Sequence, residues 1–256
     1  MVTDRTEPNT PVKTARITFR ILEALKSLDG ATVTGLADHL EMPKSSIHNY
    51  LRTLEHEGYV VRTDQRYEVG LRFLDLGGYA RSRKRLYEVA LPEMKRVADT
   101  TGEYANLLVE EHGLGVFVAR ERGEKAVSLD SYTGQSVRLH TTALGKTILA
   151  HLPRDRVESI IEQHGLPSMT ERTITDRTEL FEALAEIEGR GVAYDREERI
   201  TGLNCVAVPI LSGGDIEGAL SVSGPVSRMD QDRIDGEILP EPRRAANIIE
   251  LNRTHS

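Results

Sequence analysis

Residues 43–59 read PKSSIHNYLRTLEHEGY, and this stretch decides how the N-terminal part of the chain is interpreted. Ile47, Leu51 and Leu54 recur at spacings of four and three, which is the period of one face of a helix. The stretch begins with a proline and has a glycine near its end, which are ordinary signals for the start and stop of a helix. We therefore expect a helix over residues 45–57 with one apolar and one polar face.

The elements around this helix complete a pattern. Residues 13–28 have the apolar spacing of an amphipathic helix, and a second short helix is expected from Val33, with Thr34 as its N-cap. After the third helix, residues 59–61 and 66–69 predict two short antiparallel strands. Three helices, a tight turn and a two-stranded wing make a winged helix-turn-helix, in which the helix after the turn lies in the DNA major groove.

The polar face of the third helix has the chemistry for DNA contact. An asparagine such as Asn49 can form a bidentate pair with adenine, which discriminates between bases by about 1–3 kcal/mol. Hydroxyls at a helix N-terminus favour phosphate, and arginines neutralise the backbone. The same face could instead be ordinary solvated surface. The candidate DNA-contacting residues are Lys44, Ser45, Ser46, His48, Asn49, Arg52, Arg62 and Arg66.

Charge is divided unevenly along the chain. Residues 1–85 hold 14 Lys and Arg against 11 Asp and Glu, whereas residues 86–256 hold 19 against 29. Phosphate is attracted to the first part and repelled by the second, which suggests two separate roles. A split of this size can also arise by chance. With one cysteine and no apolar run near 18 residues, we expect a soluble, cytoplasmic protein without disulfides, membrane spans or bound cofactors.

We expect four parts: a disordered tail at 1–12, a DNA-binding domain at 13–70, a linker helix at 71–85 and a second domain at 86–256. In the last part, helices and strands alternate irregularly, which indicates an α+β domain. Expected helices cover 91–101, 142–151, 154–163, 177–189 and 231–252. Expected strands cover 104–109, 113–119, 126–129, 192–195, 205–211 and 218–223.

Few stretches of the second domain carry chemistry. Residues 134–152 form a loop followed by a helix that starts near Thr142. Free N–H groups at the start of a helix favour the binding of an anion. Ser221 and Ser223 are two apart on a strand, so their hydroxyls point the same way. Cys205 lies in a strand of buried type and is more readily explained as a core thiol than as a nucleophile. His140 and His151 are too weak a pair to predict a metal site.

The chain resembles the IclR family of transcriptional regulators from about Lys13 to Asn252. Four ordered blocks carry the resemblance: PKSSIHNYLRTLEHEGYV, RLHTTALGKTILAHL, GVAYDREERITGLNCVAVPI and GALSVSGPVSR. The resemblance implies a GAF-like effector-binding domain with a central antiparallel sheet, a homodimer or dimer of dimers, a double-stranded DNA operator and a small organic acid as effector. It implies an effector pocket formed by Ala143, Leu144, Asp195, Cys205, Ser221 and Ser223.

This chain departs from the family pattern in two places. Many members carry Arg where this sequence has Asn49, which favours adenine over guanine. The pair Ala143 and Leu144 is bulkier than that of some members, which implies a tighter pocket. Two other functions remain open: a small-molecule enzyme with an accessory N-terminal domain, and an adaptor whose winged helix binds a protein. The sequence lacks a recognisable base–nucleophile pair, so we expect no enzyme.

Overall fold

The computed structural model describes residues 12–128 and 131–254. The chain divides into two compact units between Ala80 and Arg81. The expected tail lies, except for Val12, outside the described residues. An N-terminal helix-turn-helix unit followed by an α+β unit with an antiparallel sheet confirms the expected fold class. No helix in the described residues is long and apolar enough to cross a membrane.

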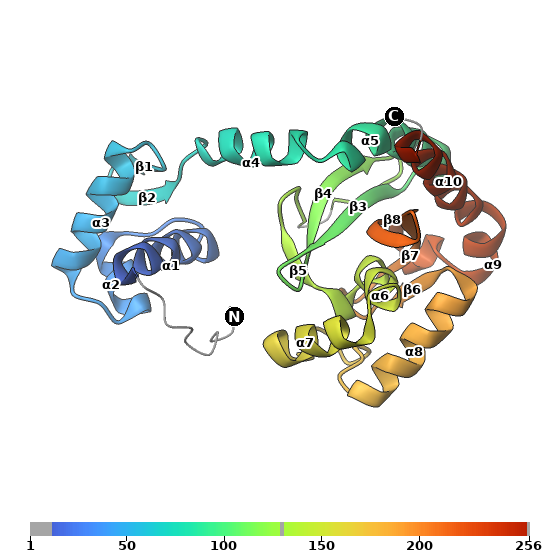
Figure 1. The fold of residues 1–256 in the computed structure, drawn as a ribbon. Coiled ribbons are helices and arrows are strands. Elements are labelled where there is room, and N and C mark those ends of the chain that lie inside the picture. Colours follow the sequence, from blue (N-terminus) through green and yellow to red (C-terminus); the bar gives the residue numbers. More distant parts are fainter. Residues whose placement is uncertain (1–11, 129–130, 255–256) are drawn as a thin grey trace. The chain divides into compact units, whose positions relative to one another are not determined.

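The N-terminal unit contains three helices and a two-stranded wing (Figure 1). Ile47, Leu51 and Leu54 are buried as the spacing predicts, in one core with Ile21 and Leu25. The helices and strands are α1 (Lys13–Ser27), α2 (Val33–Leu40), α3 (Lys44–His56), β1 (Val60–Thr63) and β2 (Arg66–Val69).

The expected N-cap of α2 was wrong. The oxygen Oγ1 of Thr32 accepts the backbone N–H of Gly35 at 3.1 Å, so Thr32 caps the helix and Thr34 lies inside it. Thr32 has the extended backbone that a capping residue needs, at φ −81° and ψ 163°. The sequence offers both Thr32 and Thr34 as possible N-caps of α2, and only the backbone geometry distinguishes between them.

Two helices follow the wing. The first, α4 (Phe73–Ser82), has no buried residue, and Leu71, Leu74 and Tyr79 expose 80%, 70% and 62% of their surface. The second, α5 (Arg85–Thr101), begins six residues earlier than the expected 91–101. Pro92 lies inside α5, where a proline ordinarily disrupts a helix. Burial of apolar residues before and after the proline compensates for the lost hydrogen bond.

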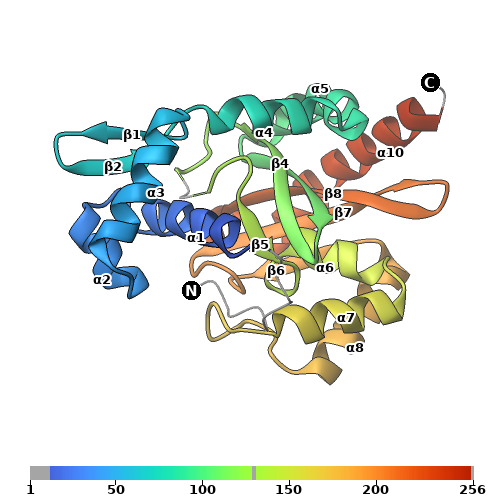
Figure 2. The ribbon, with the colours of Figure 1, turned by 60° about the vertical axis from the view of Figure 1, so that its left-hand side comes forward.

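One six-stranded antiparallel sheet organises the C-terminal unit, in the order β5-β4-β3-β8-β7-β6. Helices cover both faces: α5 and α10 lie on one, and α6, α7 and α8 on the other (Figures 1 and 2). The strands are β3 (Tyr104–Glu111), β4 (Leu114–Arg122), β5 (Ser136–Arg138), β6 (Ala193–Arg196), β7 (Leu203–Ser212) and β8 (Asp215–Pro225). The remaining long helices are α6 (Ala143–Ala150), α7 (Arg154–His164), α8 (Arg177–Arg190) and α10 (Pro240–Thr254).

Alternation along the central strands assigns each residue to one face. On β8, Leu220 and Val222 belong to the core beneath α5 and α10, while Ala219 belongs to the core beneath α6. Ser221 and Ser223 therefore face the α6 side, together with Cys205 of β7. The sheet has one dry apolar face and one face on which polar groups gather.

Two expected elements differ in the structure. Residues 126–128 form no strand, and Leu129 lies outside the described residues. The strand that pairs with β4 at this edge of the sheet is β5, which was not predicted. The helix expected over 231–252 is interrupted: α9 (Gln231–Arg233) leads into a wider π-helical turn (Ile234–Ile238) before α10 begins at a proline. Proline suits the first turn of a helix because its missing N–H needs no partner there.

Candidate functional site

The polar face of α3 is open to solvent. Lys44, Ser45, His48, Asn49 and Arg52 are all exposed, and the neighbouring Ser46 is half-buried. The N-terminus of α3 follows Pro43, which forms no side-chain cap, so N–H groups of the first turn lack a capping oxygen. Free N–H groups at a helix start form an anion site. The exposed face therefore combines a side-chain amide, cationic groups and a helix start that no side chain caps.

The two arginines of the wing are held differently. Arg62 donates from Nε to the carbonyl oxygen of Asp64 at 2.8 Å and lies 5.5 Å from the centroid of the Tyr67 ring. Arg66 donates from one nitrogen to the carbonyl oxygens of Asp29 and Gly30, at 2.9 and 2.8 Å. Arg66 thus ties the wing to the turn after α1, which leaves only its remaining N–H groups for another partner.

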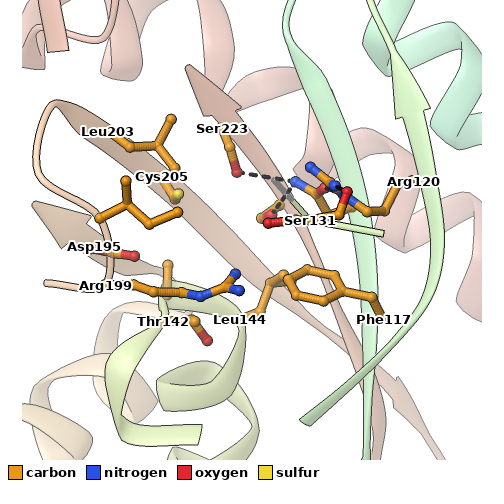
Figure 3. A pocket seen from close by; sticks show the side chains of 14 residues that line it. Phe117, Arg120, Ser131, Thr142, Leu144, Asp195, Arg199, Leu203, Cys205 and Ser223 are labelled. Carbon is orange, nitrogen blue, oxygen red and sulfur yellow. Dashed lines mark hydrogen bonds between the residues drawn. The ribbon is translucent and has the colours of Figure 1, made fainter. Parts of the chain in front are cut away.

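A pocket lies on the polar face of the sheet in the C-terminal unit (Figure 3). The space between its walls is about 390 Å³ when open solvent is counted, and about 30 Å³ of it is room for the centres of water-sized molecules. The sheet, the start of α6 and the segment after β6 form its walls. Its lining residues are Asn106, Phe117, Arg120, Ser131, Thr142, Ala143, Leu144, Asp195, Arg199, Ile200, Leu203, Cys205, Ser221 and Ser223.

The N-terminus of α6 forms one wall. Thr142 has an extended backbone, and its Oγ1 accepts the N–H of Gly145 at 2.9 Å. A Cβ atom at position 145 would overlap the backbone of Leu139, so only glycine permits this close approach. The residues between them, Ala143 and Leu144, face the pocket. The wall thus presents the positive end of a helix to whatever occupies the pocket.

A hydrogen-bonded chain crosses the sheet at the back of the pocket. Asn106 on β3 donates from Nδ2 to the hydroxyl oxygens of Ser221 and Ser223, at 3.3 and 3.0 Å. The Oδ1 of Asn106 accepts from Nε of Arg120 at 2.9 Å. Arg120 also donates to the carbonyl oxygen of Ser131. The amide of Asn106 can accept from the guanidinium and donate to both hydroxyls, which fixes its orientation.

Asp195 forms an acidic corner of the pocket. It is 2% exposed, and its Oδ1 accepts the backbone N–H of Glu198 at 2.7 Å. Burial, with a smaller contribution from the nearby charge of Glu198, raises the pKa of Asp195 to about 7. Glu198 itself forms a buried ion pair with Lys146 of α6. The charge of Lys146 is therefore neutralised inside the protein.

Arg199 brings a second guanidinium into the pocket. Its side chain crosses the pocket toward Leu144 and Phe117, and its Cζ lies 5.4 Å from the centroid of the Phe117 ring (Figure 3). Burial lowers the pKa of both Arg199 and Arg120. The sequence reasoning missed both arginines and Asn106. Arg199 belongs to a polar run that resembles a surface loop, and a β-bulge hides the position of Arg120.

The bulge changes the alternation of β4. Leu107 pairs with Ala119 and Leu108 with Phe117, so Val118 is the extra residue. Phe117 and Arg120 consequently line the same pocket although they are three apart. Strict alternation would place them on opposite faces. A bulge of this kind has no reliable signal in one sequence.

The pocket does not have the features of a catalytic site. Burial raises the pKa of the Cys205 thiol, which keeps it protonated and a poor nucleophile. His140 and His151 contact the carbonyl oxygens of Pro167 and Thr147, at 3.0 and 2.8 Å. Within residues 12–128 and 131–254, no three His, Cys, Asp or Glu side chains cluster in a way that could hold a metal.

The six residues expected in an effector pocket all line this one cavity: Ala143, Leu144, Asp195, Cys205, Ser221 and Ser223. Five of the eight residues expected to contact DNA gather on the exposed face of α3, with Ser46 half-buried beside them. The remaining two, Arg62 and Arg66, are exposed on the wing. The chain thus has two distinct candidate sites, one exposed in the N-terminal unit and one buried in the C-terminal unit.

Comparisons with known proteins agree with this architecture. A probable HTH-type transcriptional regulator ArcR of Halobacterium salinarum is 32% identical over 236 residues, 90% of each chain. The crystal structure of the Thermotoga maritima IclR superposes with a TM-score of 0.74 at 29% identity, over 93% of this chain and 98% of that one. An IclR homologue from Microbacterium hydrocarbonoxydans, complexed with 4-hydroxybenzoate, has a TM-score of 0.75 at 27% identity, over 89% and 92%.

Family matches cover both units. Residues 14–64 match the IclR helix-turn-helix domain, and residues 79–251 match the C-terminal domain of the bacterial transcriptional regulator IclR. The family and its named members are transcriptional regulators rather than enzymes. The chain belongs to the IclR family of DNA-binding transcriptional regulators.

Proposed function

We propose that this regulator responds to a small organic acid from a catabolic or central-carbon pathway, which binds the pocket of the C-terminal unit and changes DNA binding by the N-terminal unit. One observation carries the proposal: the same chain has a helix α3 with an exposed polar face and, in its C-terminal unit, a pocket lined by polar residues. The proposed division is 13–70 for DNA binding, 71–85 for the link and 86–256 for effector binding. The proposed location is the cytoplasm.

For DNA recognition, we assign base contact to the outward side chains of α3. Asn49 would form a bidentate pair with adenine, and Arg52 would contact the backbone or guanine. Lys44, Ser45 and Ser46 would hold phosphate at the start of the helix. His48 would add a contact at the groove, and the wing residues Arg62 and Arg66 would contact the neighbouring backbone. Exposure of these side chains on a packed scaffold supports the assignment.

For effector recognition, we assign the carboxylate of the ligand to the N–H groups of Ala143 and Leu144. Asp195, Ser221 and Ser223 would hydrogen-bond other polar atoms of the ligand, and Cys205 would act as a small polarisable wall. The position of Ala143 and Leu144 at the start of α6 and the polar chain through Asn106 support the assignment. The bound 4-hydroxybenzoate of the Microbacterium homologue is itself an organic acid.

The coupling would act through the sheet and the linker. Strands that line the pocket pack on their other face against α5, and α5 follows α4 in the chain. A ligand that shifts this layer would change the spacing of two DNA-binding units in a homodimer or dimer of dimers. The exposed apolar side chains of α4 support its use as a contact between subunits. A coupling free energy of about 1–3 kcal/mol is enough for a useful switch.

A mobility shift on DNA upstream of the protein's own gene tests the DNA-binding part. We expect the wild type to shift a discrete fragment and Asn49→Ala/Arg52→Ala to bind at least about 30-fold more weakly, since each of the two lost contacts costs about 1–3 kcal/mol. Lys26→Ala on α1 is the matched control, because Lys26 is an exposed cation of the same unit outside α3. Equal binding by the wild type and the double variant would reject the role of α3.

The effector part is tested in the same assay with a panel of small organic acids. A compound that changes the shift of the wild type, and loses its effect in Ser221→Ala/Ser223→Ala, would support the pocket as the sensor. An effect that persists unchanged in this variant would place the sensor elsewhere. If the wild type shifts no DNA at any salt concentration, the alternative of a protein-binding winged helix would replace the proposal.

A further inference from the structure

Two half-buried arginines of the pocket have no role in the assignment above. Arg120 comes from β4 and Arg199 from the segment after β6, and the two side chains enter the pocket from different walls (Figure 3). Their Cζ atoms lie 5.6 and 5.4 Å from the centroid of the same Phe117 ring. Each positive charge lowers the stability of the other, as the effect of Arg199 on the pKa of Arg120 shows. Such an arrangement costs free energy unless a negative group joins it.

Among residues 12–128 and 131–254, no carboxylate forms an ion pair with either of these two cations. In the part of the chain that the structure describes, Arg120 donates to an amide oxygen and a backbone carbonyl, and its Cζ lies 4.7 Å from the centroid of the Tyr104 ring. The guanidinium of Arg199 lies beside the Phe117 ring and donates to no acceptor among the same residues. The guanidinium of Arg199 and the Nη2 group of Arg120 therefore keep N–H donors for a ligand in the cavity.

The other charges near the pocket do not neutralise the pair. Lys146 and Glu198 form their own buried ion pair and cancel each other. Asp195 is the one acidic group among the residues that line the cavity, and its carboxyl is near half-protonation at neutral pH because burial disfavours its charge. The lining thus carries between one and two net positive charges. A ligand with one negative charge would leave part of this charge buried and uncompensated, at a cost in affinity.

We propose that the effector is a short dicarboxylate whose two carboxylates pair with Arg120 and Arg199, which makes these arginines the specificity-determining residues of the pocket. This inference rests on the proposed effector function of the pocket. Guanidinium groups bind carboxylates through two parallel hydrogen bonds, and such charge-assisted pairs are about twice as strong as neutral ones. The ring of Phe117, whose centroid lies within 5.6 Å of both Cζ atoms, provides an apolar surface for the carbon chain of the ligand.

Isothermal titration of the full-length protein with matched probes tests this charge requirement. Succinate and glutarate are compared with their half-amides, succinamate and glutaramate, which have the same size and one negative charge fewer. We expect at least one dicarboxylate to bind about tenfold or more tightly than its half-amide. Arg199→Gln and Arg120→Gln should each bring this affinity ratio close to one, because the second carboxylate loses its partner.

Variants of the same segment control for structural damage. Arg196→Gln removes an exposed arginine three residues from Arg199 and should leave the ratio unchanged. Arg199→Lys and Arg120→Lys keep the charge and should retain part of the preference for the dicarboxylate. If the Lys and Gln variants lose the preference equally while unfolding at the wild-type temperature, charge pairing at these positions is overturned.

The failure of this inference is distinct from the failure of the proposed function. Half-amides that bind as tightly as the dicarboxylates would overturn the dicarboxylate assignment and leave an organic-acid sensor standing. If none of the four probes binds, the dicarboxylate assignment is overturned. If a wider panel of monocarboxylates and aromatic acids also fails while the protein still shifts DNA, the effector role of the pocket is overturned too.

Discussion

Helices α3 and α6 are both short, and both start after a residue with an extended or proline-fixed backbone, yet they use their residues in opposite ways. α3 buries Ile47, Leu51 and Leu54 and exposes its polar side chains. All eight residues of α6 are buried, including Lys146 and Thr147. The polar residues of α3 are available to a large partner, whereas those of α6 are satisfied inside the protein. A surface for a macromolecule thus exposes its polar side chains to solvent, whereas a site for a small molecule buries them among partners inside the protein.

The largest expected effect comes from breaking the buried charge of α6. Lys146→Met leaves Glu198 buried without its partner, so we expect the free energy of unfolding of the C-terminal unit to fall by about 3–5 kcal/mol. Urea denaturation followed by circular dichroism measures this. Lys26→Met is the matched control, because Lys26 pairs with Glu23 on the exposed face of α1 and such pairs contribute about 0–1 kcal/mol. Equal losses in both variants would show that burial does not distinguish the two pairs.

A second prediction separates the two faces of α3. Ile47→Ala should lower the stability of the N-terminal unit by about 2–5 kcal/mol, because Ile47 is fully buried in its core. Asn49→Ala, two residues away and exposed, should change stability by no more than about 0.5 kcal/mol. Thermal unfolding of both variants measures the difference. A large stability loss in Asn49→Ala would mean that its side chain supports the fold instead of remaining available to DNA.

A third prediction concerns the acidic corner of the pocket. The pKa of Asp195 is raised to about 7, so the folded state binds a proton that the unfolded state releases between pH 4 and pH 7. The stabilisation linked to this proton is present below the unfolded pKa and is lost as the pH rises through the folded pKa. Asp195→Asn cannot titrate, and it keeps an oxygen for the N–H of Glu198.

We therefore expect the stability of the wild type, relative to Asp195→Asn, to fall by about 2 kcal/mol between pH 5 and pH 7. Urea denaturation of both proteins at each pH gives this difference, in which the titration of all other groups cancels. A difference that is constant with pH would mean that Asp195 remains ionised in the folded protein.

The smallest expected effect is electrostatic. Affinity for DNA should fall steeply with salt, and Arg52→Ala should reduce the slope of log K against log salt by about one if Arg52 contacts a phosphate. Arg154→Ala on α7, which removes an exposed cation from the C-terminal unit, should leave the slope unchanged. Fluorescence anisotropy at several salt concentrations measures both. A similar reduction in both variants would indicate a general effect of net charge rather than a contact by α3.

The sequence predicts exposed sites better than buried ones, and particular residues show why. Ile47, Leu51 and Leu54 fix the orientation of α3, and the polar residues between them are then necessarily exposed. On strand β8, alternation correctly placed Ser221 and Ser223 on one face, whereas Cys205 of β7 was assigned to the pocket through family resemblance. Arg120 could not be placed, because the bulge at Val118 moves it to the face of Phe117. Ala143 and Leu144 were identified through family resemblance, since the uniform burial of α6 leaves no period to read.

The alternation of side chains along β8 allows two properties, ligand fit and helix packing, to evolve separately. Ser221 and Ser223 face the pocket, while Leu220 and Val222, one position along, belong to the core that holds α5. Substitutions of Ser221 and Ser223 can alter which molecule fits the pocket without disturbing the packing surface of α5. Substitutions of Leu220 and Val222 can alter the packing of the helix without touching the molecule. The ligand specificity of the pocket can therefore change during evolution while the packing of α5 on the same strand stays the same. This is a simple route by which related sensors come to bind different ligands.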